Sequence, residues 1–459
     1  MRCTVCIILF IILCMPISVL AQENDQSKEQ ELQSLRAEVN QLHKDLDSLR
    51  LQMPSTDATQ SDEVDLLEER LDKRLQELES KIDAVSRSLA PIAFNPKMVT
   101  AVNFAARSDN KDVYDSPLGQ NLISDRFFLR TVEVELSSAV DPYASAFAVI
   151  SLENEANQNF GIDAEEAYGL IKRLPILESA PLGLKVKIGK YRASLGLDNK
   201  IHIHDLPWTT RPLIVSQYLG TDHGDFFESG FNPTGMDLDF YLPNPIPGTT
   251  LEMNLDVVRS GDIAISNTNL ILPANSMLTN PNVRQPAYIG HVNLSKDWNN
   301  VSLLTLGASA YDEEGDYATH VYGVDLTYKW SPSEERESHS IVAGGEALIV
   351  DHVVVDTIYV GDLKRIHPFG WFAYLQYQTS YWLYLGTRYD WIEDPGNNDL
   401  ITRNAGVYAS YYTTEFLRFR IGFEHRQSDI PAQDNLNTLI FDLNLVFGSH
   451  PTEPYWVNK

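Results

Sequence analysis

Histidines and a carboxylate gather in one long segment, residues 192–234. His202, His204 and Asp205 stand close together there, and His223 follows. Imidazole and carboxylate groups are ligands that suit zinc, and a His-x-His pair on a strand would place both rings on one face. However, the segment offers no third ligand at a diagnostic spacing, and histidines in loops are usually only polar groups. The sequence therefore predicts no metal site and no cofactor.

A run of basic residues leads into this segment, and one more lies inside it. They are Lys185, Lys187, Lys190, Arg192 and Arg211. A basic track attracts anions, but the chain carries 63 acidic against 36 basic residues, and acidic surroundings favour cations at an opening. The sequence leaves the charge preference of any solute open. The net charge of -27 argues against a nucleic-acid partner, because phosphate backbones bind clustered Lys and Arg.

Strands of alternating hydrophobicity must position these residues. In 436–447, the last of them, Leu439 and Phe441 share one face, while Asp442 and Asn444 lie on the other. Similar segments recur through the C-terminal three-quarters of the chain, and repeats of about ten such residues are typical of transmembrane β-barrels. Charged residues that face lipid near the midplane cost about 2–4 kcal/mol each, so they must line a wet interior. The predicted fold class is an all-β transmembrane barrel of about 16 antiparallel strands.

The first 21 residues predict a cleaved secretory signal. A positive residue precedes a short apolar run, and small residues precede the expected cleavage site. The run is shorter than the roughly 20 apolar residues that span a bilayer. All three cysteines, Cys3, Cys6 and Cys14, lie inside this signal. The mature chain would therefore form no disulfide and no thiolate metal site.

Residues 22–94 predict an α-helical coiled-coil region. Their leucines recur at alternating spacings of three and four, with an interruption at Pro54. An oligomeric coiled coil explains so narrow an apolar stripe better than the alternative, a single helical hairpin that folds back at the proline. Beyond residue 94 the period changes from 3.5 to 2. We therefore expect three parts, namely a signal peptide at 1–21, a coiled coil at 22–94 and a barrel at 95–459.

The expected connections between strands alternate between short and long, as the topology of outer-membrane barrels requires. The longest is 192–234, and it contains apolar residues such as Ile214, Leu219 and Phe226, which would sit poorly in water. We therefore expect this loop to fold into the barrel and narrow it. The alternative is a cap that packs on neighbouring loops outside the barrel.

Two adjacent runs resemble a known family. They are EEAYGLIKRLP at 165–175 and GKYRASLGLDNKIHIHDLPW at 189–208. Together they resemble the bacterial outer-membrane porin superfamily that includes phosphate-selective porins, whose members pair an EAY strand with a Gly-Lys-Tyr/Phe-Arg strand and a loop inside the lumen. The resemblance covers most of 95–459 and implies a sixteen-stranded, trimeric diffusion pore. It carries over no phosphate site, because the sequence shows no dense arginine ladder.

The expected function is therefore that of a porin, a water-filled channel for passive diffusion of small hydrophilic solutes. The residues expected at its constriction are Lys185, Lys187, Lys190, Arg192, His202, His204, Asp205, Arg211 and His223. Two alternatives stay open: an uptake channel specific for a metal ion or metal chelate, and a barrel-anchored adhesin. An enzyme is not expected, because the chain contains neither G-x-S-x-G nor HExxH.

The same resemblance implies where the protein would reside and what it would contact. We expect the outer membrane of a Gram-negative bacterium, with outer-membrane lipid around the barrel and the N-terminal region in the periplasm. A homotrimer is expected, because three coiled-coil helices would suit a trimer of pores. The coiled coil could clamp that trimer or contact peptidoglycan or another periplasmic partner.

Overall fold

The computed structural model describes Ser34 and most of the unit formed by Pro96–Lys459. Within 96–448 it leaves out 114–126, 142, 155–159, 173–180, 221–229, 244–245, 266–285, 299–300, 315–317, 333–338, 356–362 and 432. The expected signal peptide at 1–21 and coiled coil at 22–94 thus lie outside the described residues, apart from the helical Ser34. In the described part of the chain, no helix is both long and apolar enough to cross a membrane.

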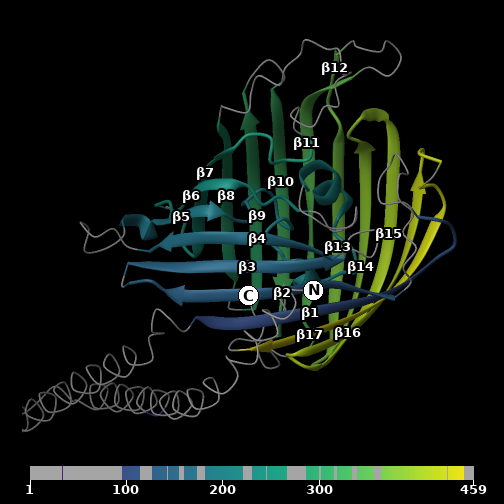
Figure 1. Cartoon of the computed structure of the whole chain (residues 1–459), viewed down its shortest axis with the longest axis horizontal. Coiled ribbons are helices and arrows are strands. Elements are labelled where there is room, and N and C mark those ends of the chain that lie inside the picture. The colour runs from purple at the N-terminus through teal and green to yellow at the C-terminus, as the bar shows by residue number, and fades with distance from the viewer. Residues whose placement is uncertain are drawn as a thin grey trace, which may run out of the picture. The chain divides into compact units, whose positions relative to one another are not determined.

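The described part of this unit is built almost entirely of β-strands (Figure 1). They are β1 (Lys97–Asp109), β2 (Phe127–Ala139), β3 (Ala144–Asn154), β4 (Phe160–Ile171), β5 (Lys185–Lys190), β6 (Thr234–Tyr241), β7 (Thr249–Arg259), β8 (Pro286–Trp298), β9 (Ser302–Glu313), β10 (Thr319–Trp330), β11 (Ile341–Val355), β12 (Leu363–Ile366), β13 (Phe369–Ser380), β14 (Leu383–Asp394), β15 (Asn397–Thr414), β16 (Leu417–Ser428) and β17 (Leu436–Gly448). Three short helical turns complete the elements, η1 (Pro181–Gly183), η2 (Ile203–Asp205) and η3 (Val215–Leu219).

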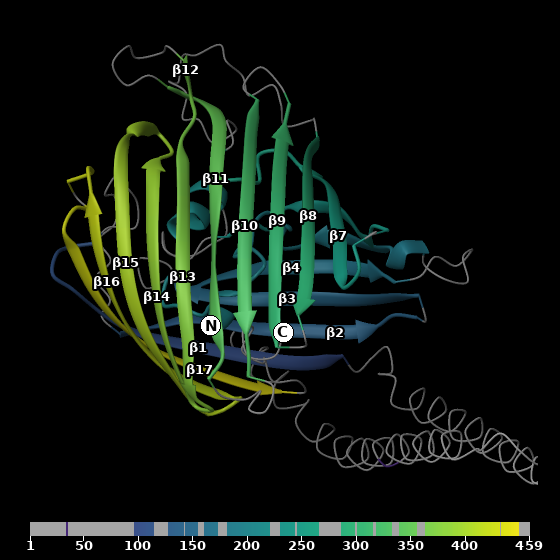
Figure 2. The ribbon, with the colours of Figure 1, turned by 180° about the vertical axis from the view of Figure 1, so that it is seen from behind.

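The strands close into a barrel in which each pairs antiparallel with its neighbours along the chain. The ring closes where β1 pairs with β17, in a register that places Phe104 opposite Leu443. β11 pairs with both β12 and β13, so the short β12 extends one strand and the other sixteen described strands form the ring. Strands β1–β4 cross the direction of β8–β11 at a large angle in the two opposite views (Figures 1 and 2), as tilted strands on facing walls must. The prediction of an all-β barrel of about 16 strands is confirmed.

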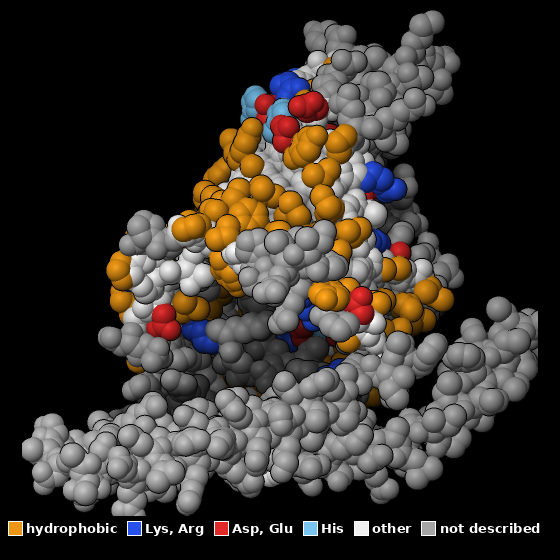
Figure 3. All heavy atoms as spheres, turned by 90° about the vertical axis from the view of Figure 1, so that its left-hand side faces the viewer, with side chains coloured by type: hydrophobic (Ala, Val, Ile, Leu, Met, Phe, Trp, Pro, Cys, Tyr) orange, Lys and Arg blue, Asp and Glu red, His pale blue; other side chains and the backbone are white. Residues whose placement is uncertain are grey.

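The two faces of strands such as β17 and β10 differ as the sequence predicts. On β17, Leu439 and Phe441 are exposed outward with 46% and 38% of their surface, whereas Asp442 and Asn444 are buried inside. On β10, Val324 is exposed outward and Asp325 is buried inward. One outer face shows the result as a broad band of hydrophobic side chains, with Lys, Arg, Asp, Glu and His gathered beyond its upper edge (Figure 3). Such a band is the surface that acyl chains cover around a transmembrane barrel.

A charge placed in the middle of this band should destabilise the barrel. Ile421 lies near the middle of β16 and is half exposed on the outer face. We expect Ile421→Arg to lower the free energy of unfolding in lipid vesicles by about 2–4 kcal/mol, the cost of an arginine at the bilayer midplane. The control is Phe416→Arg in the turn before β16, where the cost should fall to about 0–1 kcal/mol. Urea titration followed by tryptophan fluorescence measures both, and equal effects at the two positions would contradict a lipid-facing band.

Candidate functional site

The long loop leaves and re-enters the barrel wall at one point. Lys190 on β5 and Thr234 on β6 are direct register partners, so a two-strand ladder brackets the whole segment. The ladder continues inward, because the Tyr191 amide donates to the Pro233 carbonyl at 3.1 Å and the Ala193 amide donates to Phe231 at 3.3 Å. The side chains of this first inward stretch are fully buried. The loop therefore starts by turning away from the rim and into the barrel.

Gly189 permits this turn. Its φ is +141°, and a Cβ at this position would lie 2.1 Å from the Ala167 carbonyl oxygen of β4. Only glycine tolerates both the backbone conformation and the close approach. The glycine of the GKYR run therefore has a structural reason that is independent of any ligand.

Gly196 and Leu197 of the loop contact the wall at β9 and β11. The Leu197 amide donates to Glu346 Oε2 at 2.9 Å, and the Gly196 amide donates to the Ser309 hydroxyl at 3.0 Å. Gly196 has a φ of +74°, and a Cβ there would lie 1.9 Å from Glu346 Oε1. The carboxylate of Glu346 thus packs directly against the backbone of Gly196 and Leu197, which fixes where the loop crosses this wall.

Next the histidines contact the wall at β2 and β4. His202 and His204 lie next to each other with ring centroids 5.8 Å apart, beside and within η2 rather than on a strand. His204 Nδ1 is 2.8 Å from Glu133 on β2, and His202 Nε2 is 2.7 Å from Glu166 on β4. Burial lowers the pKa of His202, but the neighbouring carboxylates outweigh burial and raise that pKa to about 10.

A bulge in β4 brings two successive glutamates to the same face. Val149 of β3 pairs with Glu166 and Ile150 pairs with Ala164, so Glu165 has no partner in the register. Adjacent residues on a regular strand would point to opposite faces, whereas here both carboxylates are buried. If the EEAY run formed a regular strand, the alternation of its side chains would place one of these two glutamates on the face toward lipid.

The far end of the loop contacts β13–β16. Arg388 on β14 ion-pairs with Asp390 at 2.9 Å and donates two hydrogen bonds to Thr210. Asp390 in turn accepts from the Leu213 amide at 3.1 Å. Glu424 on β16 accepts from the Thr210 hydroxyl at 2.7 Å. These groups are almost completely shielded from solvent, so the loop is held by charged hydrogen bonds rather than by apolar contact alone.

Apolar packing completes this contact. Trp208 meets Phe372 and Tyr374 of β13 edge-on, with centroids 5.9 and 4.9 Å away. The short π-helix η3 follows, and Tyr218 in it donates to the Glu393 carbonyl at 2.7 Å. Residues of the loop and of the inner wall form one hydrophobic cluster inside the barrel. These contacts place the described residues of the loop against the inner side of the wall, and the narrowing of a channel by the loop stays a prediction.

The predicted basic track is paired with aspartates. Lys185, Lys187 and Lys190 lie on β5, and each has an aspartate carboxylate on a neighbouring strand. The partners, in the same order, are Asp239 at 3.3 Å, Asp237 at 3.6 Å and Asp163 at 2.8 Å. This part of the wall therefore presents mixed charge and not a basic strip.

The remaining predicted residues hold the loop together. Arg192 ion-pairs with Glu165, and Arg211 donates to the Ile201 carbonyl at 2.8 Å and to Asp198 at 3.3 Å. Asp205 lies 3.5 Å from the ring of its neighbour His204. The structure thus brings all of these predicted residues onto the inner wall or the loop, but most of them face protein groups. His223 lies outside the described residues.

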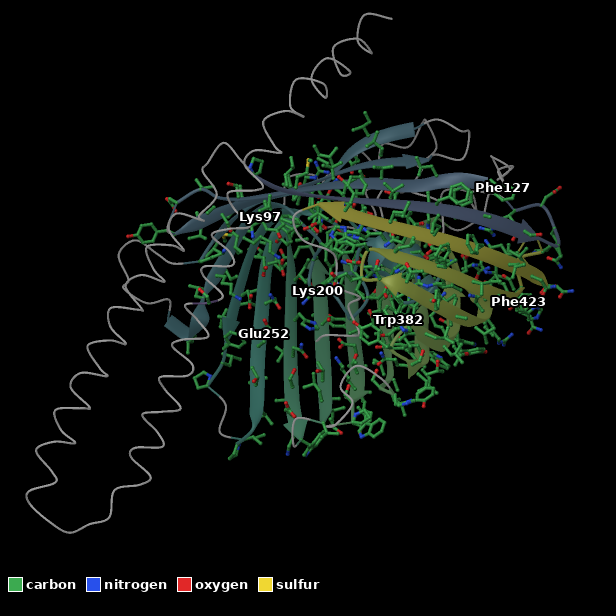
Figure 4. All side chains as sticks on the ribbon, turned by 90° about the horizontal axis from the view of Figure 1, so that it is seen from below. Lys97, Phe127, Lys200, Glu252, Trp382 and Phe423 are labelled. Atoms are coloured by element: carbon green, nitrogen blue, oxygen red, sulfur yellow. The ribbon has the colours of Figure 1, made fainter. Side chains whose placement is uncertain are left out.

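The charge of the loop itself also depends on burial. Burial raises the pKa of Asp198 to about 6, against the opposing effects of Arg211 and Arg388. Burial lowers the pKa of Lys200 below its usual value, although Glu252 favours the charged amine. Lys200 lies inside the ring of strands when the barrel is seen from below, with Glu252 on the wall (Figure 4).

Sequence reasoning missed a group of buried arginines on β2 and β16. Arg418, on β16, donates to Asp442 at 3.1 Å, and Arg130, on β2, lies 3.6 Å from the same carboxylate. Arg420 donates to the Trp208 carbonyl of the loop at 2.5 Å. The signal was the run RFRIGFEHR, in which Arg418 and Arg420 alternate with Phe419 and Ile421, and Arg426 follows at the same period of two. Arg420 supports the loop, and Arg418 and Arg130 pair with Asp442, so these three do not form an open ladder for anions.

A cavity of about 170 Å³ remains between the loop and the wall. Its lining combines Lys200 and Trp208 of the loop with Asp325 and Lys329 of β10 and Gln376 of β13. Both signs of charge and an aromatic surface thus face the same space. Such a lining suits water and small polar solutes better than a hydrocarbon chain.

Comparisons with known proteins show which chains this one is similar to. No protein-family model matches the chain. A protein of Aquifex aeolicus (strain VF5), described only as uncharacterized, is 25% identical over 358 residues, which cover 72% of this chain and 70% of that one.

Among solved structures, the anion-selective porin from Comamonas acidovorans aligns with a TM-score of 0.47 at 10% identity, over 77% of this chain and 99% of that one. OmpF of Salmonella typhi aligns with a TM-score of 0.46 at 6% identity, covering 77% and 98%. The outer membrane channel DcaP of Acinetobacter baumannii aligns with a TM-score of 0.45 at 8% identity, over 77% of this chain and 97% of that one. Values this low carry no functional conclusion, which has to come from the residues of the barrel.

Proposed function

We propose that this chain forms a water-filled porin in the outer membrane of a Gram-negative bacterium, for passive diffusion of small hydrophilic solutes. The observation that carries the proposal is the alternation in a closed ring. Apolar side chains such as Ile421 point outward, while charged side chains such as Asp325 and Lys329 face an internal cavity. A barrel with these two faces is stable only with lipid outside and water inside.

Within this proposal the loop at 192–234 is the constriction. Support comes from its contacts at three places around the ring, at β2 and β4 through the histidines, at β9 and β11 through residues 196 and 197, and at β14 and β16 through Thr210. A segment tied to the ring at these three places crosses the lumen, and the cavity beside it is small. Charge selectivity stays open, since lysines paired with aspartates lie on β5, and arginines paired with acids lie on β2, β14 and β16.

Liposome swelling tests the proposed transport. Purified protein is reconstituted into vesicles, which are then diluted into isotonic solutions of neutral sugars of increasing size. We expect swelling to be fast for a monosaccharide and to fall steeply for larger sugars, because the loop limits the opening. Vesicles that contain the folded barrel but swell no faster than empty ones would overturn the proposal and favour an adhesin or another non-conducting role. Repeating the assay with charged solutes measures ion preference.

We further propose a homotrimer, with the segment at 22–94 as a periplasmic coiled coil. The support is the heptad pattern of that segment, since a narrow apolar stripe needs partner helices to cover it. Mass measurement of the detergent-solubilised mature chain, with and without 22–94, tests both parts of this proposal. Trimers that persist without the segment would assign trimer contacts to the barrel, and monomers in both preparations would contradict a trimer.

A further inference from the structure

Carboxylates and imidazoles from three elements converge where the loop meets β2 and β4. Glu133 comes from β2, Glu165 from the bulge of β4, and His202 and His204 from the loop. Glu133, Glu165 and His204 are at most 1% exposed, and the side chain of His202 is 13% exposed. One member of the group thus remains reachable by small ions while the others are shielded.

The atoms of this group face a common point. His202 Nδ1 is 3.2 Å from Glu133 Oε2 and 3.3 Å from Glu165 Oε1, and His204 Nδ1 is 2.8 Å from Glu133 Oε2. Ligand atoms of Glu133, Glu165 and His202 all lie within 4.8 Å of one another. Within the described chain, Glu165 Oε2 is buried with no hydrogen-bond partner, while Glu133 Oε2 and Nδ1 of both histidines are paired only with members of this group, in poorly aligned contacts. Buried polar atoms left in this state are costly unless something else binds them.

The surrounding contacts leave the inward atoms available. His202 Nε2 is 2.7 Å from Glu166 Oε1, so this carboxylate can accept the ring N–H and leave the Nδ1 lone pair directed at the centre. Arg192 holds Glu165 through Oε1, which leaves Oε2. Groups that hydrogen-bond to a metal ligand from the side away from the metal fix the orientation of that ligand. Glu166 has this position at His202, and Arg192 has it at Glu165.

The donor set of the group also fits a metal cation. The carboxylates of Glu133 and Glu165 and the imidazoles of His202 and His204 face one another within 2.8–3.3 Å. Imidazole together with carboxylate favours zinc over magnesium or calcium, which prefer oxygen ligands alone.

We propose that Glu133, Glu165 and His202 bind one zinc-class divalent ion, with His204 as the fourth ligand. The ion would tie the loop to the wall at β2 and β4. In the sequence, the two histidines have no third ligand at a short spacing. In the barrel, Glu165 and Glu133 supply further ligands from strands that lie about 40 and 70 residues earlier in the chain. The proposal concerns binding and does not depend on solute transport.

Metal binding is measured directly on the untagged, folded barrel in detergent after treatment with a chelator. Titration with ZnCl2 in a calorimeter at pH 8 should show about one site per chain. His202→Ala and Glu165→Gln should each weaken binding by about tenfold or more. The matched control is His425→Ala, which removes a half-buried histidine hydrogen-bonded to Asn437 on β17, and it should leave zinc affinity unchanged.

Two further readouts separate a lost ligand from a misfolded barrel. Heat-modifiable migration on gels shows that each variant is folded, and cobalt bound in place of zinc reports its ligands by visible absorption. Binding should be tighter at pH 8 than at pH 6, because ligation must displace protons from the imidazoles. A folded wild-type barrel that takes up no zinc, or a folded His202→Ala variant that binds it as tightly as wild type, would overturn the proposal.

Discussion

Replacing residues 191–233 by a two-residue turn between Lys190 and Thr234 should raise single-channel conductance by about twofold or more, because a channel conducts in proportion to its narrowest section. The structure makes this replacement feasible, since these two residues are opposed in the β5–β6 ladder and a tight hairpin can join them. The charged side chains of the wall that contact the loop, such as Glu346 and Arg388, would then be solvated by water in the lumen.

The control for this deletion is a barrel that is shortened at another connection, within 114–126 between β1 and β2. Its conductance should equal that of the intact protein, because this change leaves residues 190–234 and their contacts with the wall intact. Both proteins are measured in planar bilayers at the same salt concentration. An unchanged conductance after removal of the long loop, in a barrel that still folds, would contradict its role as the constriction.

Arg388→Ala should be among the most destabilising single changes in the barrel. Arg388 and Asp390 are fully buried, and Arg388 also donates to Thr210 and lies 5.3 Å from the centre of the Trp208 ring. Removing the guanidinium strands the carboxylate of Asp390 and releases the loop. Breaking a buried pair in this way costs about 3–5 kcal/mol. Urea unfolding in lipid vesicles measures the loss.

A double variant separates the stranded charge from the lost contacts. Arg388→Ala combined with Asp390→Ala removes both charges, so it should recover part of the stability that Arg388→Ala loses. Arg259→Ala serves as the control, because the side chain of Arg259, which pairs with Asp262, is 69% exposed. Such surface pairs contribute about 0–1 kcal/mol. A double variant less stable than Arg388→Ala would show that the contacts, and not the stranded charge, dominate.

Strand positions could be read from the sequence because each transmembrane strand carries its own local signal. The period of two sorts residues such as Phe441 and Asp442 to opposite faces, and lipid and water enforce that sorting along every strand. The short β12 lacked the signal, because four residues that extend one strand beyond the ring bury no continuous face. The bulge at Glu165 was missed for a related reason, since a bulge breaks the period at one residue and leaves the rest of β4 regular.

The partners of the loop could not be read from the sequence. Thr210 meets Arg388 across 178 positions and Glu424 across 214, so no local spacing relates them. Lys185 and Lys187 looked like a free basic track because their aspartate partners lie on β6, in a register set only when the barrel forms. The apolar content of the loop predicted that it would enter the barrel, but the charged side chains of the wall decide where it lies.

Cysteine scanning of 324–329 on β10 tests the central claim most directly. All three native cysteines lie within the first 14 residues, so expression of 22–459 starts from a cysteine-free background. Single cysteines at 325, 327 and 329, which line the cavity, should react with a membrane-impermeant thiol reagent and lower the conductance. Cysteines at 324, 326 and 328, whose side chains are exposed on the outer face, should stay unmodified in lipid and leave the conductance unchanged. Reaction at all six positions alike, or at the outer three only, would contradict a lipid-facing exterior around a water-filled channel.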